Sequence, residues 1–219
     1  MTSLLTTSFG CSSDIYHKIS HDLKTTGYSI NPFGIPHELA IALCEQLQSM
    51  TDNQFKAAGV GRDDDFGKND NIRNDEICWI SGNSQAGMQW LDWCNELKEH
   101  LNKHLFLGLF SFESHFAHYP PNAFYKRHVD AFQGEKNRIL SVVLYLNRNW
   151  KKHDGGELVL YESKEDMNGI MVTPELGTLV VFLSEEFPHE VLPASTDRYS
   201  IAGWYRVNCS SENRVDPPS

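Results

Sequence analysis

The sequence predicts a mainly β protein, with a β-barrel or jelly-roll core and flanking N-terminal helices that pack on one sheet. Two observations support this fold class. From residue 107 onward the apolar runs are short, rich in Val, Ile, Leu, Phe and Tyr, and interrupted by Gly and Pro, as in a barrel or sandwich of many short strands. Before residue 107 the apolar residues recur at helical spacing. A length of 219 residues suits one such domain.

Three helices are expected in the N-terminal half. The first begins near Asp14 and ends at Gly27, and the second runs from Pro36, a favoured first-turn residue, to about Met50. The third spans residues 84–104 and carries an apolar stripe. A polar loop rich in Gly, Asp and Asn separates the second helix from the third, at residues 59–71. Loops this long in a compact domain are more often functional than accidental.

The expected strands cover residues 72–80, 107–119, 139–146, 157–161, 170–173, 178–183, 190–192 and 199–207. We therefore expect a single domain over residues 1–219. Residues 1–106 provide helical support and the 59–71 loop, residues 107–208 form the β core, and residues 209–219 form a tail. The helices could instead form a small separate domain, but no linker divides them from the strands.

Composition argues against several classes of function. The formal net charge of −10 disfavours binding to nucleic acid or to anionic membranes, because phosphate binding needs clustered Lys and Arg. No stretch approaches the roughly 18 apolar residues of a membrane span, and the N-terminus lacks the pattern of a signal peptide. The five cysteines are odd in number and have no short spacing, so we interpret them as reduced, mostly buried thiols of a cytoplasmic protein.

The segment Arg127-His128-Val129-Asp130 carries the chemistry. Residues two apart in a strand share a face, so His128 and Asp130 can reach one metal ion. A third ligand is expected from His189, which precedes another strand. Two histidines and one carboxylate form the facial triad of non-haem Fe(II) oxygenases, with coordination positions left open. A His-x-Asp pair alone is weak evidence, since it also occurs by chance on surfaces.

Arg198 strengthens the interpretation. It lies nine residues after His189 in an apolar strand, and one β-hairpin could carry both residues. A guanidinium binds a carboxylate through two hydrogen bonds and stays charged, as the distal carboxylate of 2-oxoglutarate requires. The alternative is an ordinary salt bridge from Arg198 to Asp or Glu, because a buried charge needs a partner on any interpretation.

A family resemblance rests on motifs that occur in order: Tyr119-Pro120-Pro121, Tyr125-Lys126-Arg127-His128-Val129-Asp130, Tyr145-Leu146-Asn147, Gly155-Gly156-Glu157-Leu158, Pro188-His189-Glu190-Val191 and Arg198-Tyr199. Together, over residues 72–207, they resemble the prolyl 4-hydroxylase branch of the Fe(II)/2-oxoglutarate oxygenases. The resemblance is closest to the oxygen-sensing prolyl hydroxylases that act on hypoxia-inducible factor and to their bacterial counterparts that hydroxylate elongation factor Tu. It implies a double-stranded β-helix core.

The resemblance implies a role for each matching residue. His128, Asp130 and His189 would hold Fe(II), and Arg198 would bind the distal carboxylate of 2-oxoglutarate. Hydrogen bonds to this cosubstrate are implied for two tyrosines, Tyr119 and Tyr145, for which barrel packing is the alternative.

The substrate side of the site is also implied. Trp204 would lie near the substrate proline unless it is a core tryptophan, and Trp79 follows the loop at residues 59–71, which would act as a lid. Asp75 and Arg138 match a pair that encloses a peptide, with a surface ion pair as the alternative. The chain departs from the family at Ala202, where the family has threonine. A second departure is a loop one residue shorter between Tyr119 and His128.

The implied activity is oxidative decarboxylation of 2-oxoglutarate to succinate, coupled to C4 hydroxylation of proline in a protein substrate. Fe(II), 2-oxoglutarate and O2 are the implied cofactor and cosubstrates, with ascorbate as a further one. Elongation factor Tu is the first candidate substrate, and we expect a monomer. The alternatives are the same chemistry on a free amino acid or small molecule, a nucleic-acid demethylase, and an inactive metal-binding module. Succinate assays with peptides and with free proline would distinguish a protein hydroxylase from a small-molecule oxygenase. Iron titration and measurement of 2-oxoglutarate turnover would distinguish an enzyme from an inactive metal-binding module.

Overall fold

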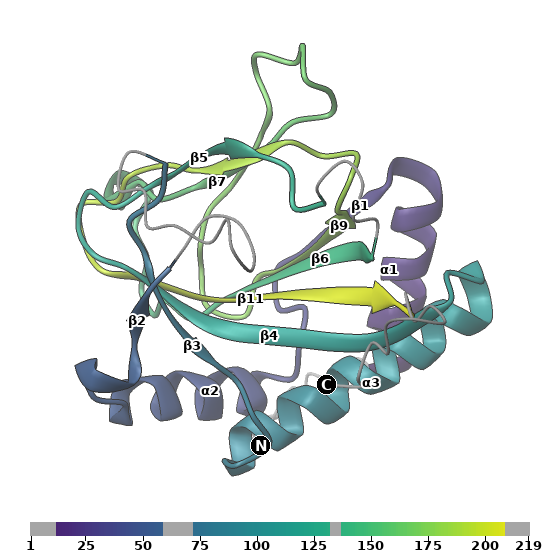
Figure 1. The fold of residues 1–219 in the computed structure, drawn as a ribbon, viewed down its shortest axis with the longest axis horizontal. Helices are drawn as coiled ribbons and strands as arrows, with labels where there is room; N and C mark the ends of the chain where they lie inside the picture. Colours follow the sequence, from purple (N-terminus) through teal and green to yellow (C-terminus); the bar gives the residue numbers. More distant parts are fainter. Residues whose placement is uncertain (1–11, 59–71, 132–136, 209–219) are drawn as a thin grey trace, which may run out of the picture.

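The computed structural model describes residues 12–58, 72–131 and 137–208 and shows three layers (Figure 1). Two antiparallel sheets face each other, and the helices cover the outer face of the larger sheet. The loop at residues 59–71 and the tail at residues 209–219, which the sequence assigned to a lid and a frayed end, lie outside the described residues.

Three α-helices form the outer layer: α1 (Ser12–Thr26), α2 (His37–Ser49) and α3 (Gln85–Leu105). The helix α1 ends at Gly27, which has a φ of +81° and whose N–H donates to the carbonyl of Leu23. Such a left-handed residue favours glycine. At the start of α3 the Ser84 hydroxyl accepts a hydrogen bond from the backbone N–H of Gly87, so it caps the helix.

The larger sheet has seven strands in the order β1-β9-β6-β11-β4-β3-β2. Their bounds are β1 (Tyr28–Asn31), β2 (Lys56–Ala57), β3 (Glu76–Trp79), β4 (Leu109–Tyr119), β6 (Arg138–Tyr145), β9 (Leu179–Leu183) and β11 (Arg198–Val207). The smaller sheet has four strands in the order β5-β10-β7-β8. Their bounds are β5 (Tyr125–His128), β7 (Leu158–Leu160), β8 (Ile170–Val172) and β10 (His189–Val191). Two short 3-10 helices, η1 (Asp52–Gln54) and η3 (Lys152–Asp154), lie in connections.

Two hydrophobic clusters hold the layers together. One joins the three helices to the larger sheet and includes Trp90 and Phe116, and the other lies between the two sheets and includes Ala117 and Phe182. Phe116 and Ala117 are neighbours on β4 and point to opposite faces, as alternate strand residues do. The inward face of the larger sheet is therefore set by strand alternation, and the candidate site lies between that face and the smaller sheet.

The fold class predicted from the sequence is confirmed, but one local expectation is wrong. His189 and Arg198 are not carried by one hairpin, because β10 pairs with β5 and β7 whereas β11 pairs with β4 and β6. The chain crosses from one sheet to the other between them. No helix in the described part of the chain is long and apolar enough to cross a membrane. The described cysteines are free thiols, with Cys44 and Cys94 buried and Cys78 partly buried.

Candidate functional site

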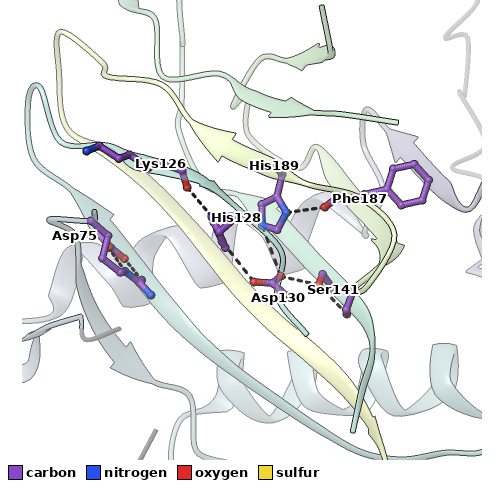
Figure 2. Close-up of polar contacts among 9 residues, drawn as sticks. Asp75, Lys126, His128, Asp130, Ser141, Phe187 and His189 are labelled. Atoms are coloured by element: carbon purple, nitrogen blue, oxygen red, sulfur yellow. Dashed lines mark hydrogen bonds and ion pairs between the residues drawn. The ribbon is translucent and has the colours of Figure 1, made fainter. Parts of the chain in front are cut away.

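The structure brings His128, Asp130 and His189 together between the sheets (Figure 2). His128 ends β5 and His189 begins β10, and the two residues are direct partners in the smaller sheet. The Nε2 atom of His128 lies 3.5 Å from Asp130 Oδ1, and that of His189 lies 3.6 Å from Asp130 Oδ2. One potential ligand atom from each residue lies within 4.8 Å of the other two. These distances leave room for one metal ion among the three.

Backbone carbonyls fix the two imidazoles. The Nδ1 atom of His128 lies 2.8 Å from the carbonyl oxygen of Lys126, and that of His189 lies 3.1 Å from the carbonyl oxygen of Phe187. A carbonyl oxygen only accepts, so each neutral ring carries its proton on Nδ1 and presents the Nε2 lone pair to the shared space. Metal-binding histidines are oriented by this kind of bond. The donor set therefore fits a divalent metal ion.

Asp130 connects the two sheets. Its Oδ2 accepts a 2.6 Å hydrogen bond from the hydroxyl of Ser141 on β6, and Ser141 also lies 2.9 Å from the Ser184 hydroxyl. Burial alone would raise the pKa of Asp130, but His189, His128 and the Ser141 hydrogen bond hold it well below its usual range. Asp130 is accordingly a carboxylate, which is the form that binds metal.

The pKa of His189 also favours its role as a ligand. Burial, reinforced by the nearby His128, lowers this pKa to about 4. His189 is therefore neutral near pH 7, with its lone pair available. Aromatic side chains hold both rings in place: Tyr125 stacks on His128 with ring centroids 3.5 Å apart, and Phe182 packs edge-on against His189 at 4.9 Å.

Arg198 is 1% exposed, on the same inward face of the larger sheet as Ser141. Its Nε donates a 2.8 Å hydrogen bond to the carbonyl of Gly156, and Nη1 lies 3.4 Å from the Ser200 hydroxyl. Among the residues the structure describes, no Asp or Glu lies within ion-pair distance of it. A buried guanidinium without a carboxylate is costly, so the surroundings of Arg198 fit an acidic ligand better than an internal salt bridge.

Tyr119 and Tyr145 flank this guanidinium, each with its ring centroid 5.0 Å from the Arg198 Cζ. Burial raises the pKa of Tyr145 to about 12, although Arg198 opposes the shift. The Tyr145 hydroxyl is therefore protonated, and within the described chain it lacks a hydrogen-bond partner of good geometry. It is free to donate to a ligand carboxylate beside Arg198.

Gly156 packs against the same arginine side chain. Its φ is +73°, and an added Cβ would lie 2.9 Å from the Ala194 Cβ and 3.2 Å from the Arg198 Cδ. A side chain at this position would therefore be strained and would press on the arginine.

The residues expected to face a peptide lie on or beside the larger sheet. Asp75 is buried and forms two hydrogen bonds, of 2.7 and 2.5 Å, with Arg73. Arg138 donates to Glu113 at 3.0 Å and lies 3.7 Å above the ring of Trp204. The structure thus records different partners for Asp75 and Arg138, and their joint role around a peptide stays a prediction. Trp79 is 54% exposed.

Sequence reasoning missed three residues of the site: Ser141, Arg73 and His115. His115 is buried, with its ring centroid 5.1 Å from that of Trp79 and 5.5 Å from that of Trp204. Strand alternation could have identified His115, which shares a face with Tyr119, and Ser141, which shares a face with Tyr145. No pattern in the sequence pairs Arg73 with Asp75 rather than with another carboxylate.

Comparison with known proteins agrees with this geometry. The model of the 2OG-Fe(II) oxygenase superfamily matches residues 114–206. A prolyl-4-hydroxylase from Pseudomonas putida superposes with a TM-score of 0.77 at 40% identity, covering 88% of this chain and 98% of that one. A prolyl hydroxylase from Trichoplax adhaerens, solved with a hypoxia inducible factor peptide fragment, superposes with a TM-score of 0.76 at 26% identity, covering 89% and 90%.

Human Egl nine homolog 1 is 34% identical over 144 residues, which cover 61% of this chain but only 33% of that protein. The chain belongs to the 2OG-Fe(II) oxygenase superfamily. The Pseudomonas putida and Trichoplax adhaerens proteins, to which it is similar, are prolyl hydroxylases, in agreement with the sequence motifs. It is therefore an enzyme that uses Fe(II), with 2-oxoglutarate and O2 as cosubstrates.

Proposed function

We propose that this enzyme is a prolyl 4-hydroxylase of a protein substrate, with elongation factor Tu as the first candidate. In this proposal His128, Asp130 and His189 bind Fe(II), and Arg198 with Tyr145 binds the distal carboxylate of 2-oxoglutarate. Two relatives support the reaction: the Pseudomonas putida protein is a prolyl-4-hydroxylase, and the Trichoplax adhaerens enzyme was solved with a peptide.

The observation that carries the proposal is that two sites between the sheets each lack a partner of opposite charge: the cluster of metal-ligand residues and the guanidinium of Arg198. Among the described residues, potential ligand atoms of His128, Asp130 and His189 lie close together with no protein cation between them. The buried guanidinium of Arg198 lies on the inward face of the larger sheet, and no carboxylate of the described chain pairs with it. An α-keto acid with a distal carboxylate completes both sites at once. No single protein side chain could do so.

The chain's own residues have separable roles in the reaction. When bound, Fe(II) with 2-oxoglutarate and O2 supplies the oxidising chemistry that inserts oxygen into a substrate C–H bond. Arg198 and the Tyr145 hydroxyl orient the cosubstrate by its distal end. Ser141 holds the Asp130 carboxylate, and the carbonyls of Lys126 and Phe187 hold the imidazoles. Apolar residues of the inter-sheet cluster, such as Phe182 against His189, pack beside the ligands and limit the access of water.

The substrate proline is expected beside Trp204, on the inward face of the larger sheet. Trp204 is opposite Ser141 in the pairing of β11 with β6, so it is one strand away from the residue that holds Asp130. Arg138 covers the ring of Trp204. The ring of His115 contacts both Trp204 and the exposed Trp79, so the two tryptophans lie on either side of this histidine. An aromatic surface of this kind suits the apolar ring of proline.

The test measures succinate production and substrate mass together. Purified enzyme with Fe(II) and 2-oxoglutarate is incubated with prolyl peptides of elongation factor Tu, with the intact factor, and with free proline. Peptide-dependent succinate and a mass gain of one oxygen atom on proline would support the proposal. Turnover on free proline but on no peptide would replace it with a small-molecule oxygenase, and metal binding without turnover on any substrate would indicate an inactive module.

Replacing any of His128, Asp130 or His189 with Ala should abolish turnover and leave the far-ultraviolet circular dichroism unchanged. His153→Gln is a matched control, because His153 has an exposed side chain (78%). Wild-type turnover in any of the three alanine variants would contradict the ligand assignment.

A further inference from the structure

A second group of three histidines lies in the helical layer, outside the inter-sheet space. His17 is on α1, and His100 and His104 are on α3. The two helices pack against each other on the outer side of the larger sheet (Figure 1). The candidate iron ligands lie on the other side of that sheet, so this cluster is a separate feature.

The three rings are in mutual contact. The centroid of His100 lies 4.0 Å from that of His104 in a stacked arrangement and 4.6 Å from that of His17, and His17 lies 5.2 Å from His104. One ring nitrogen from each residue lies within 4.8 Å of the other two. His100 and His104 are four residues apart on one helix, so they share a face, and His17 approaches them from the neighbouring helix.

The nitrogen atoms are prepared for a cation. The Nδ1 atom of His104 lies 2.8 Å from the carbonyl oxygen of His100, so it carries the proton and leaves the Nε2 lone pair free. The Nε2 atom of His100 is buried and has no hydrogen-bond partner in the described part of the chain. A neutral imidazole is the form that binds a metal ion.

We propose that His17, His100 and His104 bind a divalent late first-row metal ion, of the nickel, copper or zinc class, and clamp α1 to α3. Three imidazoles and no carboxylate select this class over magnesium or calcium. Three protein ligands leave a further coordination position for water. Since His17 and His104 are exposed, the ion can exchange with solvent, and the bound metal stabilises the packing of the N-terminal helix.

Zinc is the probe for the test, added to the full-length, tag-free chain and measured by competition with a chromophoric chelator. The wild-type chain should bind two zinc ions, one at each histidine cluster. His128→Ala should retain the helical site. In His17→Gln and in His104→Gln the inter-sheet site should bind zinc as in the wild type, and the zinc affinity of the helical site should fall at least about 10-fold. Removing a residue that only hydrogen-bonds to a metal ligand already lowers metal affinity about 10- to 100-fold, so removing a ligand should cost at least as much. His21→Gln, also exposed on α1 and outside the cluster, is the matched control.

Two further measurements separate this site from the catalytic one. In the His128→Ala background, zinc should raise the unfolding temperature, and adding His17→Gln should remove that rise. His17→Gln should also leave Fe(II)-dependent 2-oxoglutarate turnover unchanged, so a failure of the proposed hydroxylase activity would not affect this test. If His128→Ala binds no zinc, or if His17→Gln and His104→Gln bind zinc as His21→Gln does, the proposal is wrong. Chelator competition below the melting temperature of each variant keeps the comparison valid if a variant is less stable.

Discussion

Replacing Arg198 with lysine should weaken 2-oxoglutarate binding about 10- to 100-fold and leave metal binding unchanged. The substitution retains the positive charge and removes the planar fork. In the structure, the Arg198 Nε is engaged by the Gly156 carbonyl at 2.8 Å and one terminal nitrogen faces Ser200 at 3.4 Å. A lysine has one donor nitrogen, so it cannot stay beside that carbonyl and also present two parallel N–H donors to a ligand carboxylate.

The magnitude follows from the lost contact. One charge-assisted hydrogen bond contributes roughly 1.5–3 kcal/mol, and each 1.4 kcal/mol is a factor of about ten in the dissociation constant. The Gly156 carbonyl also loses its partner, so the variant should be less stable to heat. The proposed metal ligands lie on β10, β5 and the residues that follow β5, and within the described chain none of them contacts Arg198, so the affinity for the ion should not change.

Anaerobic isothermal titration calorimetry of 2-oxoglutarate into metal-loaded enzyme measures the effect directly. Arg148→Lys is the matched control, because Arg148 has a 41% exposed side chain and only a 3.8 Å contact with Glu45. Its dissociation constant for 2-oxoglutarate should equal that of the wild type. An unchanged constant in Arg198→Lys as well would refute the assignment of Arg198 as the carboxylate anchor.

Three further predictions test the surroundings of the site. Ser141→Ala removes the 2.6 Å hydrogen bond to Asp130; it should lower metal affinity about 10- to 100-fold, and equal affinity in a chelator competition would show that Asp130 needs no such support. Gly156→Ala should cost about 1–3 kcal/mol of stability in chemical denaturation and weaken 2-oxoglutarate binding, because its Cβ would lie 3.2 Å from the Arg198 Cδ; full binding would argue against close packing there. Burial lowers the pKa of His115 from 6.5 in the unfolded chain to about 4 in the folded one. As the pH falls from 6.5 towards 4, this histidine becomes protonated in the unfolded chain but stays neutral in the folded chain. The free energy of unfolding should therefore fall over that range. Over that pH range, the free energy of unfolding of the His115→Gln variant should fall by up to about 3 kcal/mol less than that of the wild type. Identical pH profiles of unfolding for the two proteins would contradict the assigned shift.

The helices and most strands could be predicted from the sequence because their signals are local. Pro36 and Ser84 stand at the starts of α2 and α3, and Gly27 follows the end of α1. The strands β1 and β2 were not expected, because they have four and two residues and carry no alternation long enough to detect. Their pairing depends on neighbours far along the chain, β1 with β9 and β2 with β3.

The residues proposed to bind the metal and 2-oxoglutarate were accessible from sequence because each belongs to a motif with fixed chemistry. The contacts that support them were not. Ser141 on the larger sheet reaches Asp130, in the segment after β5, across ten intervening positions. Tyr125 stacks on His128 within β5 of the smaller sheet. Partner choice among several charges, such as Arg73 with Asp75, is decided by three-dimensional distance. Such a choice of partner produces no periodic pattern in the sequence.

The incorrect hairpin expectation has a structural consequence. A hairpin would have fixed the distance between His189 and Arg198 by local turn geometry. Instead, the ligands His128 and His189 belong to the smaller sheet, and Arg198 belongs to the larger one. Their separation is therefore set by the packing of side chains between the sheets, with Phe182 on the larger sheet in contact with the His189 ring. The Asp130–Ser141 hydrogen bond is a direct polar link across that gap. Side chains that space the sheets should accordingly set the position of the proposed cosubstrate anchor relative to the proposed metal ligands, even where they touch neither.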